Sequence, residues 1–192
     1  MKNVLILGAS GGLAKYVIDE LQKQDDIHLT LFLRDKNRLN NKLGKNCDII
    51  EGDVLDGRKL TEAMVGKDIV YVNLAGDLWA MAEKIEKAMI ETGVKRVIAI
   101  SSIGIYDTPL KSVLVSYRKL ADVFENSNLD YTILRPAWFT STNEVDFEIT
   151  RKGEPERGSV ISMKSLATFI TSIIHLPQNY IRESLGINKP NS

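Results

Sequence analysis

Glycines with a spacing suited to phosphate binding follow the first apolar run of the chain. Residues 8–14 read Gly8-Ala9-Ser10-Gly11-Gly12-Leu13-Ala14, and the first, fourth and seventh of them form a G-x-x-G-x-x-A pattern. In this pattern one glycine makes a tight turn, a second lets the backbone approach a pyrophosphate, and a small third residue lets helix and strand pack closely. The free N–H groups and positive dipole end of the following helix would hold the anion. We therefore predict that residues 8–14 bind a dinucleotide; an ordinary turn that needs glycine only for its geometry is the alternative.

The residue at the end of the second apolar run decides which dinucleotide is expected. NAD enzymes usually place Asp or Glu there to accept hydrogen bonds from the adenosine 2'-hydroxyl. Here Arg34 holds this position, and Lys36 and Arg38 follow it closely. A guanidinium can bind a 2'-phosphate through two parallel charge-assisted hydrogen bonds, whereas a carboxylate would repel it. The sequence thus predicts NADP(H) in preference to NAD(H), although Asp35 could turn toward the site instead, or pair with Arg34.

Two further stretches are expected to line the same cleft. Gly52-Asp53-Val54 follows the third apolar run, where an adenine would rest, and Asn73-Leu74-Ala75-Gly76 follows the fourth. Both stretches stand at the carboxyl ends of predicted strands, which is where open α/β sheets bind ligands. The candidate cofactor-binding residues in them are Asp53, Val54, Leu74, Ala75 and Gly76.

These segments are positioned by an alternation of short apolar runs with stretches of helical spacing, which is typical of parallel βαβ units. Strands are expected at 3–8, 28–34, 48–52, 68–74, 95–101 and 130–135. Helices are expected at 11–24, 57–66, 78–93, 110–127 and 164–176, with Asp56, Asp77 and Asp107 as candidate N-caps. We predict an α/β fold, a Rossmann-like doubly wound parallel sheet in three αβα layers, formed by a single domain over residues 1–192.

One segment, 138–160, departs from the alternation. It is rich in loop-forming residues, among them Gly153, Pro155 and Gly158. We expect it to form a lid or substrate loop over the cleft. The tail at 179–188 is expected to add one more strand.

Composition argues against several classes of partner. Lys and Arg together number 25, as do Asp and Glu, so the formal net charge of +0 supplies no broad positive field for nucleic acid or an anionic membrane. The one cysteine, Cys47, cannot form an internal disulfide, and no Cys/His cluster has metal-ligand spacing. We therefore expect no metal site and a reducing, cytoplasmic location. The first apolar run, at residues 4–7, is far too short for a signal-peptide core or a membrane span.

Taken together, the motifs resemble those of the atypical short-chain dehydrogenase/reductases. The pieces that carry this resemblance are the turn at Gly8, Arg34, Gly52-Asp53-Val54, Leu74-Ala75-Gly76, Ile100-Ser101-Ser102 and Asp130-Tyr131-Thr132-Ile133-Leu134-Arg135-Pro136. The Thr-Ile-Leu-Arg-Pro run and the closing Glu183-Ser184-Leu185-Gly186-Ile187 are most similar to the NAD(P)-binding, NmrA-like branch, which includes the biliverdin-IXβ/flavin reductases. The resemblance implies a Rossmann fold that binds NAD(P), with Pro136 and Ala137 at the floor of the nicotinamide site.

The resemblance fails at the usual catalytic pair, a Tyr-x-x-x-Lys on the helix after the fifth strand. Alignment of the motifs puts Leu114 at the tyrosine position and Arg118 at the lysine position. Leucine cannot donate a proton, and arginine stays protonated near neutral pH, although Arg118 could still bind ribose hydroxyls. Tyr117, about one helical turn beyond Leu114, is the best replacement and Tyr106 the second, and either could serve packing alone.

Hydride transfer to a flat acceptor needs no acid residue. A flavin or quinone can be reduced when it merely stacks on the nicotinamide, because the cofactor brings the chemistry and solvent supplies the protons. Ser101 or Ser102 could orient the nicotinamide carboxamide or a substrate oxygen. Trp79, Trp138 and Phe139 are expected near the cleft mouth, where aromatic side chains suit a flat ligand, although each alone could be packing. We therefore predict an oxidoreductase, an NADPH-dependent reductase of a small planar acceptor such as a flavin or quinone.

Two other functions are compatible with the same residues. A non-catalytic NADP(H) sensor that signals to a protein partner would equally lack the Tyr-Lys pair. A sugar-nucleotide epimerase or dehydratase is the second alternative, although little chain follows Pro136 to build a large substrate domain. For the enzyme we expect a small-molecule substrate, no nucleic-acid or membrane partner, and a monomer or small homo-oligomer.

Overall fold

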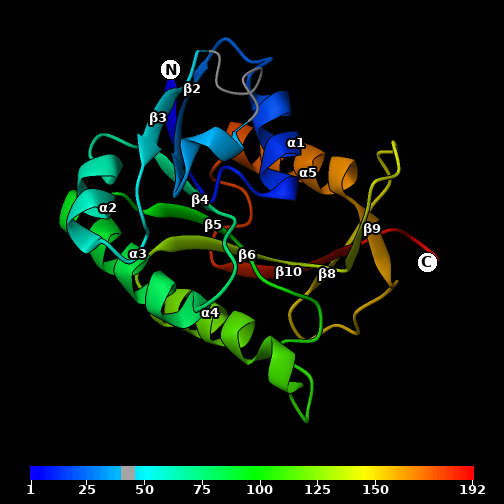
Figure 1. Cartoon of the computed structure of the whole chain (residues 1–192). Coiled ribbons are helices and arrows are strands. Elements are labelled where there is room, and N and C mark those ends of the chain that lie inside the picture. Colours follow the sequence, from blue (N-terminus) through cyan, green and yellow to red (C-terminus); the bar gives the residue numbers. More distant parts are fainter. Residues whose placement is uncertain (40–45) are drawn as a thin grey trace.

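The computed structural model describes residues 1–39 and 46–192 and places one large sheet between two layers of helices (Figure 1). The sheet consists of β1 (Lys2–Leu7), β2 (Ile27–Leu33), β3 (Asp48–Glu51), β4 (Ile69–Val72), β5 (Arg96–Ile100), β6 (Asp130–Pro136), β8 (Glu148–Arg151) and β10 (Glu183–Asn188). Their order in space is β3-β2-β1-β4-β5-β6-β10-β8, and all neighbours are parallel except β10 and β8. The first six strands have the order of a Rossmann fold, so the predicted doubly wound sheet is confirmed.

Consecutive apolar residues of β1 divide between two cores. Val4 and Ile6 are fully buried on the face that α1 and α5 cover, whereas Leu5 and Leu7 are fully buried on the opposite face. Successive side chains of a strand point to opposite faces, so a strand covered on both sides needs an apolar residue at every position. This is why the predicted strands appear in the sequence as continuous apolar runs.

The helices form the two outer layers (Figure 1). They are α1 (Gly12–Leu21), α2 (Gly57–Met64), α3 (Leu78–Thr92), α4 (Val115–Asn126) and α5 (Met163–His175). Helices α1 and α5 pack together on one face, and α3 packs between α2 and α4 on the other. Asp56 and Asp77 are confirmed as N-caps, since their side chains accept hydrogen bonds from the amides of Lys59 and Ala80 at 3.2 Å.

The helix expected at 110–127 begins later than predicted, and Asp107 is not its cap. A short 3₁₀ turn, η2 (Ser112–Leu114), precedes α4, and the N-cap residue Leu114 makes no side-chain capping bond. The upstream part buries little apolar surface: Val113 is 75% exposed, Leu114 is only partly buried against the core, and fully buried residues of α4 start at Leu120. A segment that buries little apolar surface gains little stability by forming an α-helix, because most helical stability in proteins comes from packing.

The last part of the chain extends the sheet and adds a second, smaller one. The tail forms β10, as expected. The segment 138–160, expected to be loop-rich, includes β7 (Trp138–Thr140) and β8, and β7 pairs with β9 (Val160–Ser162) in a two-stranded parallel sheet. None of the helices in the described residues is long and apolar enough to cross a membrane.

Candidate active site

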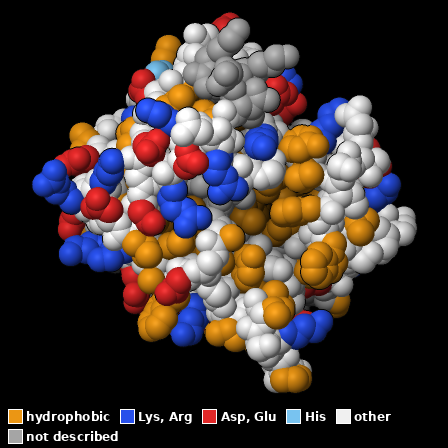
Figure 2. Space-filling model, viewed as in Figure 1, with side chains coloured by type: hydrophobic (Ala, Val, Ile, Leu, Met, Phe, Trp, Pro, Cys, Tyr) orange, Lys and Arg blue, Asp and Glu red, His pale blue; other side chains and the backbone are white. Residues whose placement is uncertain are grey.

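A cleft of about 850 Å³ lies at the carboxyl ends of β1, β2, β4, β5 and β6. In Figure 2 it is the hollow bordered by hydrophobic side chains, with Lys and Arg side chains beside it. The candidates from the sequence that line it are Gly8, Ser10, Gly11, Gly12, Leu13, Arg34, Asp53, Val54, Leu74, Ala75, Ser101, Ser102, Tyr117, Pro136 and Ala137. The neighbours of β1 in the sheet, β2 and β4, lie on its two sides, so the cleft occupies the switch point at which open α/β sheets bind ligands.

The first turn of α1 presents free backbone amides to this cleft. Gly11 is the N-cap, and no side chain caps the helix. Gly12 and Leu13 line the cleft, and their N–H groups have no hydrogen-bond acceptor within residues 1–39 and 46–192. Such amides, at the positive end of the helix dipole, bind anions well. The turn therefore fits the diphosphate that the glycine spacing predicts.

Two of the glycines are also required by packing within the protein. Gly8 has a φ of +81°, and a Cβ at this position would overlap the carbonyl oxygen of Asn73, which follows β4. A Cβ at Gly11 would lie 2.6 Å from the side-chain nitrogen of the same asparagine. Gly12, in contrast, has only the Met163 sulfur nearby, at 3.9 Å. Gly8 and Gly11 are thus required by the geometry of the turn, which was the alternative explanation of the glycine pattern. Of these three glycines, only Gly12 has room for a side chain.

Gly8→Ala is expected to destabilise the protein beyond the cost of its backbone conformation. Gly66→Ala is the matched control, because Gly66 has a φ of +71° and a Cβ added there would have no heavy atom within 4 Å. We expect the control to lose about 1 kcal/mol of unfolding free energy from the left-handed backbone. The Gly8 variant should lose roughly 2 kcal/mol more, because the overlap with Asn73 forces the backbone to move. Urea denaturation measures both losses, and equal values would contradict the packing role of Gly8.

The adenosine end of the cleft carries two arginines. Arg34, directly after β2, and Arg38 in the 3₁₀ turn η1 (Lys36–Arg38) both line it, and Lys36 does not. Asp35 also lines the cleft, but one of its carboxylate oxygens accepts the amide of Asn37 at 2.9 Å and so caps η1. The competing interpretation, in which Asp35 takes the role of an NAD-type carboxylate, is weakened because this carboxylate is already held by its own turn.

An apolar wall faces these charges. Phe32, Leu33 and Val54 line the cleft where the adenine was expected. A Cβ at Gly52 would lie 2.7 Å from the edge of the Phe32 ring, so a glycine is required for the ring to take its place. Phe32 is fully buried in the core and lies inside a predicted strand, where its hydrophobic character gives no sign that the residue also borders the cleft.

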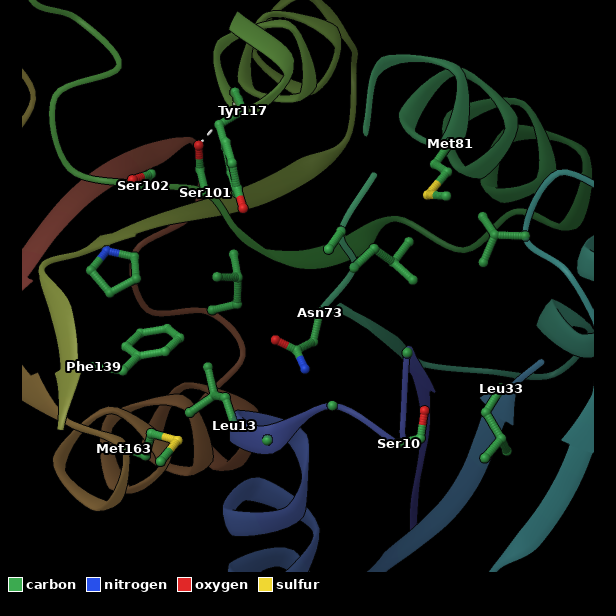
Figure 3. A pocket seen from close by; sticks show the side chains of 18 of the residues that line it. Ser10, Leu13, Leu33, Asn73, Met81, Ser101, Ser102, Tyr117, Phe139 and Met163 are labelled. Carbon is green, nitrogen blue, oxygen red and sulfur yellow. Dashed lines mark hydrogen bonds between the residues drawn. The ribbon is translucent and has the colours of Figure 1, made fainter. Parts of the chain in front are cut away.

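The other end of the cleft holds the predicted polar residues (Figure 3). Ser101 is 3% exposed and its hydroxyl donates to the backbone oxygen of Tyr117 at 3.1 Å, while the Ser102 hydroxyl donates to the Ile103 oxygen at 3.2 Å. The phenol ring of Tyr117 reaches into the cleft, and its hydroxyl has no hydrogen-bond partner in the described part of the chain. Of the three candidate catalytic residues, Tyr117 is therefore the one whose hydroxyl proton is free to be donated to a ligand, whereas the two serine hydroxyls can only accept a further hydrogen bond.

Arg118 was expected to bind ribose, but it does not line the cleft. Its guanidinium pairs with Asp122 at 2.7 Å and lies 4.9 Å from the centre of the Tyr106 ring, outside the cleft. Leu114 and Arg118 are four residues apart, so they would share one face only if a single α-helix ran through both. Leu114 instead ends a 3₁₀ turn, with a different angle per residue, so it lines the cleft while Arg118 faces away.

Tyr106 is also excluded as the proton donor for this cleft. It does not line the cleft, and its hydroxyl donates to a Glu125 carboxylate oxygen at 2.6 Å and lies 3.0 Å from the Ser184 hydroxyl. Burial, with a further contribution from Glu125, raises the pKa of Tyr106 well above its ordinary value. The hydroxyl is therefore held in an internal network and is a poor acid.

Three further candidates support the site without lining it. Ala9 and Ala14 are fully buried in the core, where small side chains let α1 pack closely on the sheet. The carbonyl of Gly76 accepts hydrogen bonds from the Leu78 amide and the Ser116 hydroxyl, so this residue anchors the start of α3 instead. Trp79, expected at the mouth, lies outside the cleft with its ring centre 4.0 Å from the Lys119 ammonium. Trp138 and Phe139 do line it.

Several lining residues are not among those expected from the sequence. They are Met81, Ile103, Lys111, Val113 and Met163, together with Phe32 and Leu33, whereas Asn73 lines the cleft with the stretch that was expected there. Met163 starts α5, some 150 positions beyond the glycine turn it faces, and no local pattern marks it (Figure 3). Among the residues that the structure describes, no group of three or more His, Cys, Asp or Glu side chains could hold a metal ion.

Comparison with known proteins agrees with this geometry. A Rossmann-fold NAD(P)-binding family protein from Shigella flexneri is 44% identical and superimposes with a TM-score of 0.92, over 100% of this chain and 95% of that one. A short-chain dehydrogenase/reductase from Veillonella parvula, solved in complex with NADP, is 27% identical with a TM-score of 0.91, over 99% and 95%. The divinyl chlorophyllide a 8-vinyl-reductase of Arabidopsis thaliana is 25% identical over 98% of this chain, which spans 53% of that protein. The profile of the NAD(P)H-binding family matches residues 8–177, and the chain belongs to this family.

Proposed function

We propose that the protein is an NADPH-dependent reductase of a small planar acceptor such as a flavin or quinone. The observation that carries this proposal is the continuity of one cleft, which joins the free amides of α1 and Arg34 to a zone lined by Tyr117, Trp138 and Phe139. The NADP bound by the similar Veillonella protein and the reductase activity in the name of the Arabidopsis relative support it. The preference for NADPH over NADH rests on Arg34 and Arg38 alone.

Each part of the cleft has a separate task in this proposal. The amides of Gly12 and Leu13 would hold the diphosphate, and Arg34 would hold the 2'-phosphate. Bound NADPH supplies a hydride at its nicotinamide ring. Pro136 and Ala137, which line the cleft, would form the floor for this ring, and Trp138, which is 79% exposed, is available to stack on a flat acceptor at the mouth. We propose that the segment 138–160 covers the acceptor through its first two residues.

Tyr117→Phe is expected to reduce turnover of a quinone by less than about tenfold. Loss of a true general acid typically costs about 100- to 10,000-fold, and here solvent can protonate the reduced acceptor. Stopped-flow or steady-state loss of NADPH absorbance measures the rate. A larger loss with unchanged NADPH affinity would make Tyr117 an essential acid and remove the argument for an acceptor that needs none.

A panel of acceptors tests the function itself. The purified protein should consume NADPH with at least one flavin or quinone and should consume NADH more slowly. Tight NADPH binding without turnover of any acceptor would instead favour the non-catalytic sensor. The backbone hydrogen bonds that already hold the Ser101 and Ser102 hydroxyls are the observation that favours this alternative.

We further infer a small-molecule substrate, no nucleic-acid or membrane partner, and a monomer or small homo-oligomer. The balanced charge supports the inference of no nucleic-acid or membrane partner, and the single cysteine supports a cytoplasmic location.

A further inference from the structure

A second cavity, of about 640 Å³, lies beside the cleft. It is bounded by the loop after β5 and by the turn after β8, and it shares the lining residues Ile103, Lys111 and Leu114 with the cleft. A buried arginine, Arg135 of β6, faces it and is only 2% exposed. Arg135 lines this second cavity and not the cleft, whereas its neighbour in β6, Pro136, lines the cleft.

The buried guanidinium is only partly satisfied by the protein. One terminal nitrogen forms an ion pair with Glu156, and the other donates weakly to the Ser184 oxygen at 3.5 Å. The Nε atom of Arg135 is buried and has no hydrogen-bond partner among the described residues. A guanidinium presents a planar fork that matches a carboxylate through two parallel bonds, so the protein leaves this buried cation without its full set of partners.

The Glu156 carboxylate is the group that contacts the Arg135 guanidinium in the structure. One of its carboxylate oxygens pairs with Arg135, and the other accepts the backbone amide of Gly104 at 2.7 Å. Its side chain is 17% exposed, whereas the neighbouring residues Pro155 and Arg157 on the same turn are exposed. A single carboxylate thus reaches inward from a surface turn and bridges a buried cation and an amide, with open space around it.

We propose that Arg135 and the Gly104 amide form a carboxylate-binding subsite for the acceptor, and that Glu156 is an internal occupant displaced when the acceptor's carboxylate enters. The substrate class is then a planar acceptor that carries a carboxylate, with its ring in the cleft and its acid group beyond Leu114. The identification of the ligand as the acceptor rests on the proposed function. The carboxylate site itself does not depend on it. Lys111, which lines both cavities, adds a second cation along the route.

Other acidic residues around the cavity restrict where an anion can bind. Asp107 and Glu154 also line it, so it has no general positive charge. One Glu154 oxygen already accepts the Arg151 amide at 2.6 Å. A ligand carboxylate can therefore be held only where the Glu156 carboxylate lies. The ligand must displace Glu156 in order to bind.

Benzoate, with neutral benzamide as its match, tests the subsite directly. The amide signal of Gly104 in a ¹⁵N NMR spectrum reports on the carboxylate it contacts. Benzoate in the millimolar range should shift this signal in the wild-type protein, and benzamide should not. Glu156→Gln should tighten benzoate binding by about tenfold or more, since the competing charge is gone while the amide side chain preserves the shape. Glu154→Gln also removes a negative charge from the cavity lining, but not the one paired with Arg135, so it is the control and should change the affinity far less.

The possible outcomes separate this proposal from the proposed function. No shift at Gly104 with wild type or with Glu156→Gln, or an equal shift with benzamide, would overturn the subsite even if NADPH is consumed with acceptors. A benzoate-specific shift that strengthens in Glu156→Gln would support the subsite even if no acceptor is turned over. Should Glu156→Gln fail to fold, the wild-type comparison of benzoate with benzamide decides by itself.

Discussion

Gly12→Asp is expected to abolish measurable binding of both NADPH and NADH while the protein stays folded. The new carboxylate would stand at the first position of α1, directly where the amides of Gly12 and Leu13 face the cleft. It would repel a diphosphate and compete with it for the amides, so we expect a loss of at least about 100-fold, or roughly 3 kcal/mol. Isothermal titration calorimetry with each nucleotide measures this loss.

The fold should tolerate this substitution for reasons that the structure supplies. Gly12 does not have a positive φ, and the nearest heavy atom to a Cβ is the Met163 sulfur at 3.9 Å. A carboxylate in the first helical turn also interacts favourably with the helix dipole, so the thermal midpoint should not fall. Gly12→Asn, of the same size without the charge, is the matched control and should keep most of the affinity. Equal losses of affinity in the two variants would show that the size of the new side chain, and not its charge, weakens nucleotide binding.

Arg34→Glu is expected to weaken NADPH binding by about 2 kcal/mol or more, which is roughly 30-fold, and to leave NADH binding unchanged or slightly stronger. The arginine lines the cleft at the end of β2, where a 2'-phosphate would lie, and the substituted carboxylate would repel that phosphate. NADH has a 2'-hydroxyl in place of the phosphate, and this hydroxyl can donate a hydrogen bond to a carboxylate. The ratio of the two dissociation constants is the quantity to measure.

Lys36→Glu provides the matched control for this charge reversal. Lys36 is two residues further on and exposed, but it does not line the cleft. A general effect of net charge would weaken NADPH binding similarly in both variants, and it would decline as salt is added. A specific contact predicts a large effect at Arg34 only. Unchanged NADPH affinity in Arg34→Glu would remove the reason for preferring NADPH.

The sheet and the glycine turn can be predicted from the sequence because their causes are local. Strands covered on both faces need consecutive apolar residues, and the buried run at β1, from Val4 to Leu7, shows this pattern without interruption. The turn at Gly8 follows that run directly, so the strand itself determines that the turn lies at the carboxyl end of β1. The same holds for Arg34, since it ends the second run.

The tertiary structure alone decided which side chains face the cleft at its reacting end. The expected positions of Leu114 and Arg118 require one continuous helix, but helix geometry depends on packing, and the segment before α4 buries little apolar surface. Met163 and Lys111 reach the cleft from distant segments that no local pattern connects to it. The pairing of Glu156 with Arg135 likewise joins a surface turn to a buried strand. Local periodicity determines strands, turns and their order, whereas contacts between distant segments depend on how the layers pack.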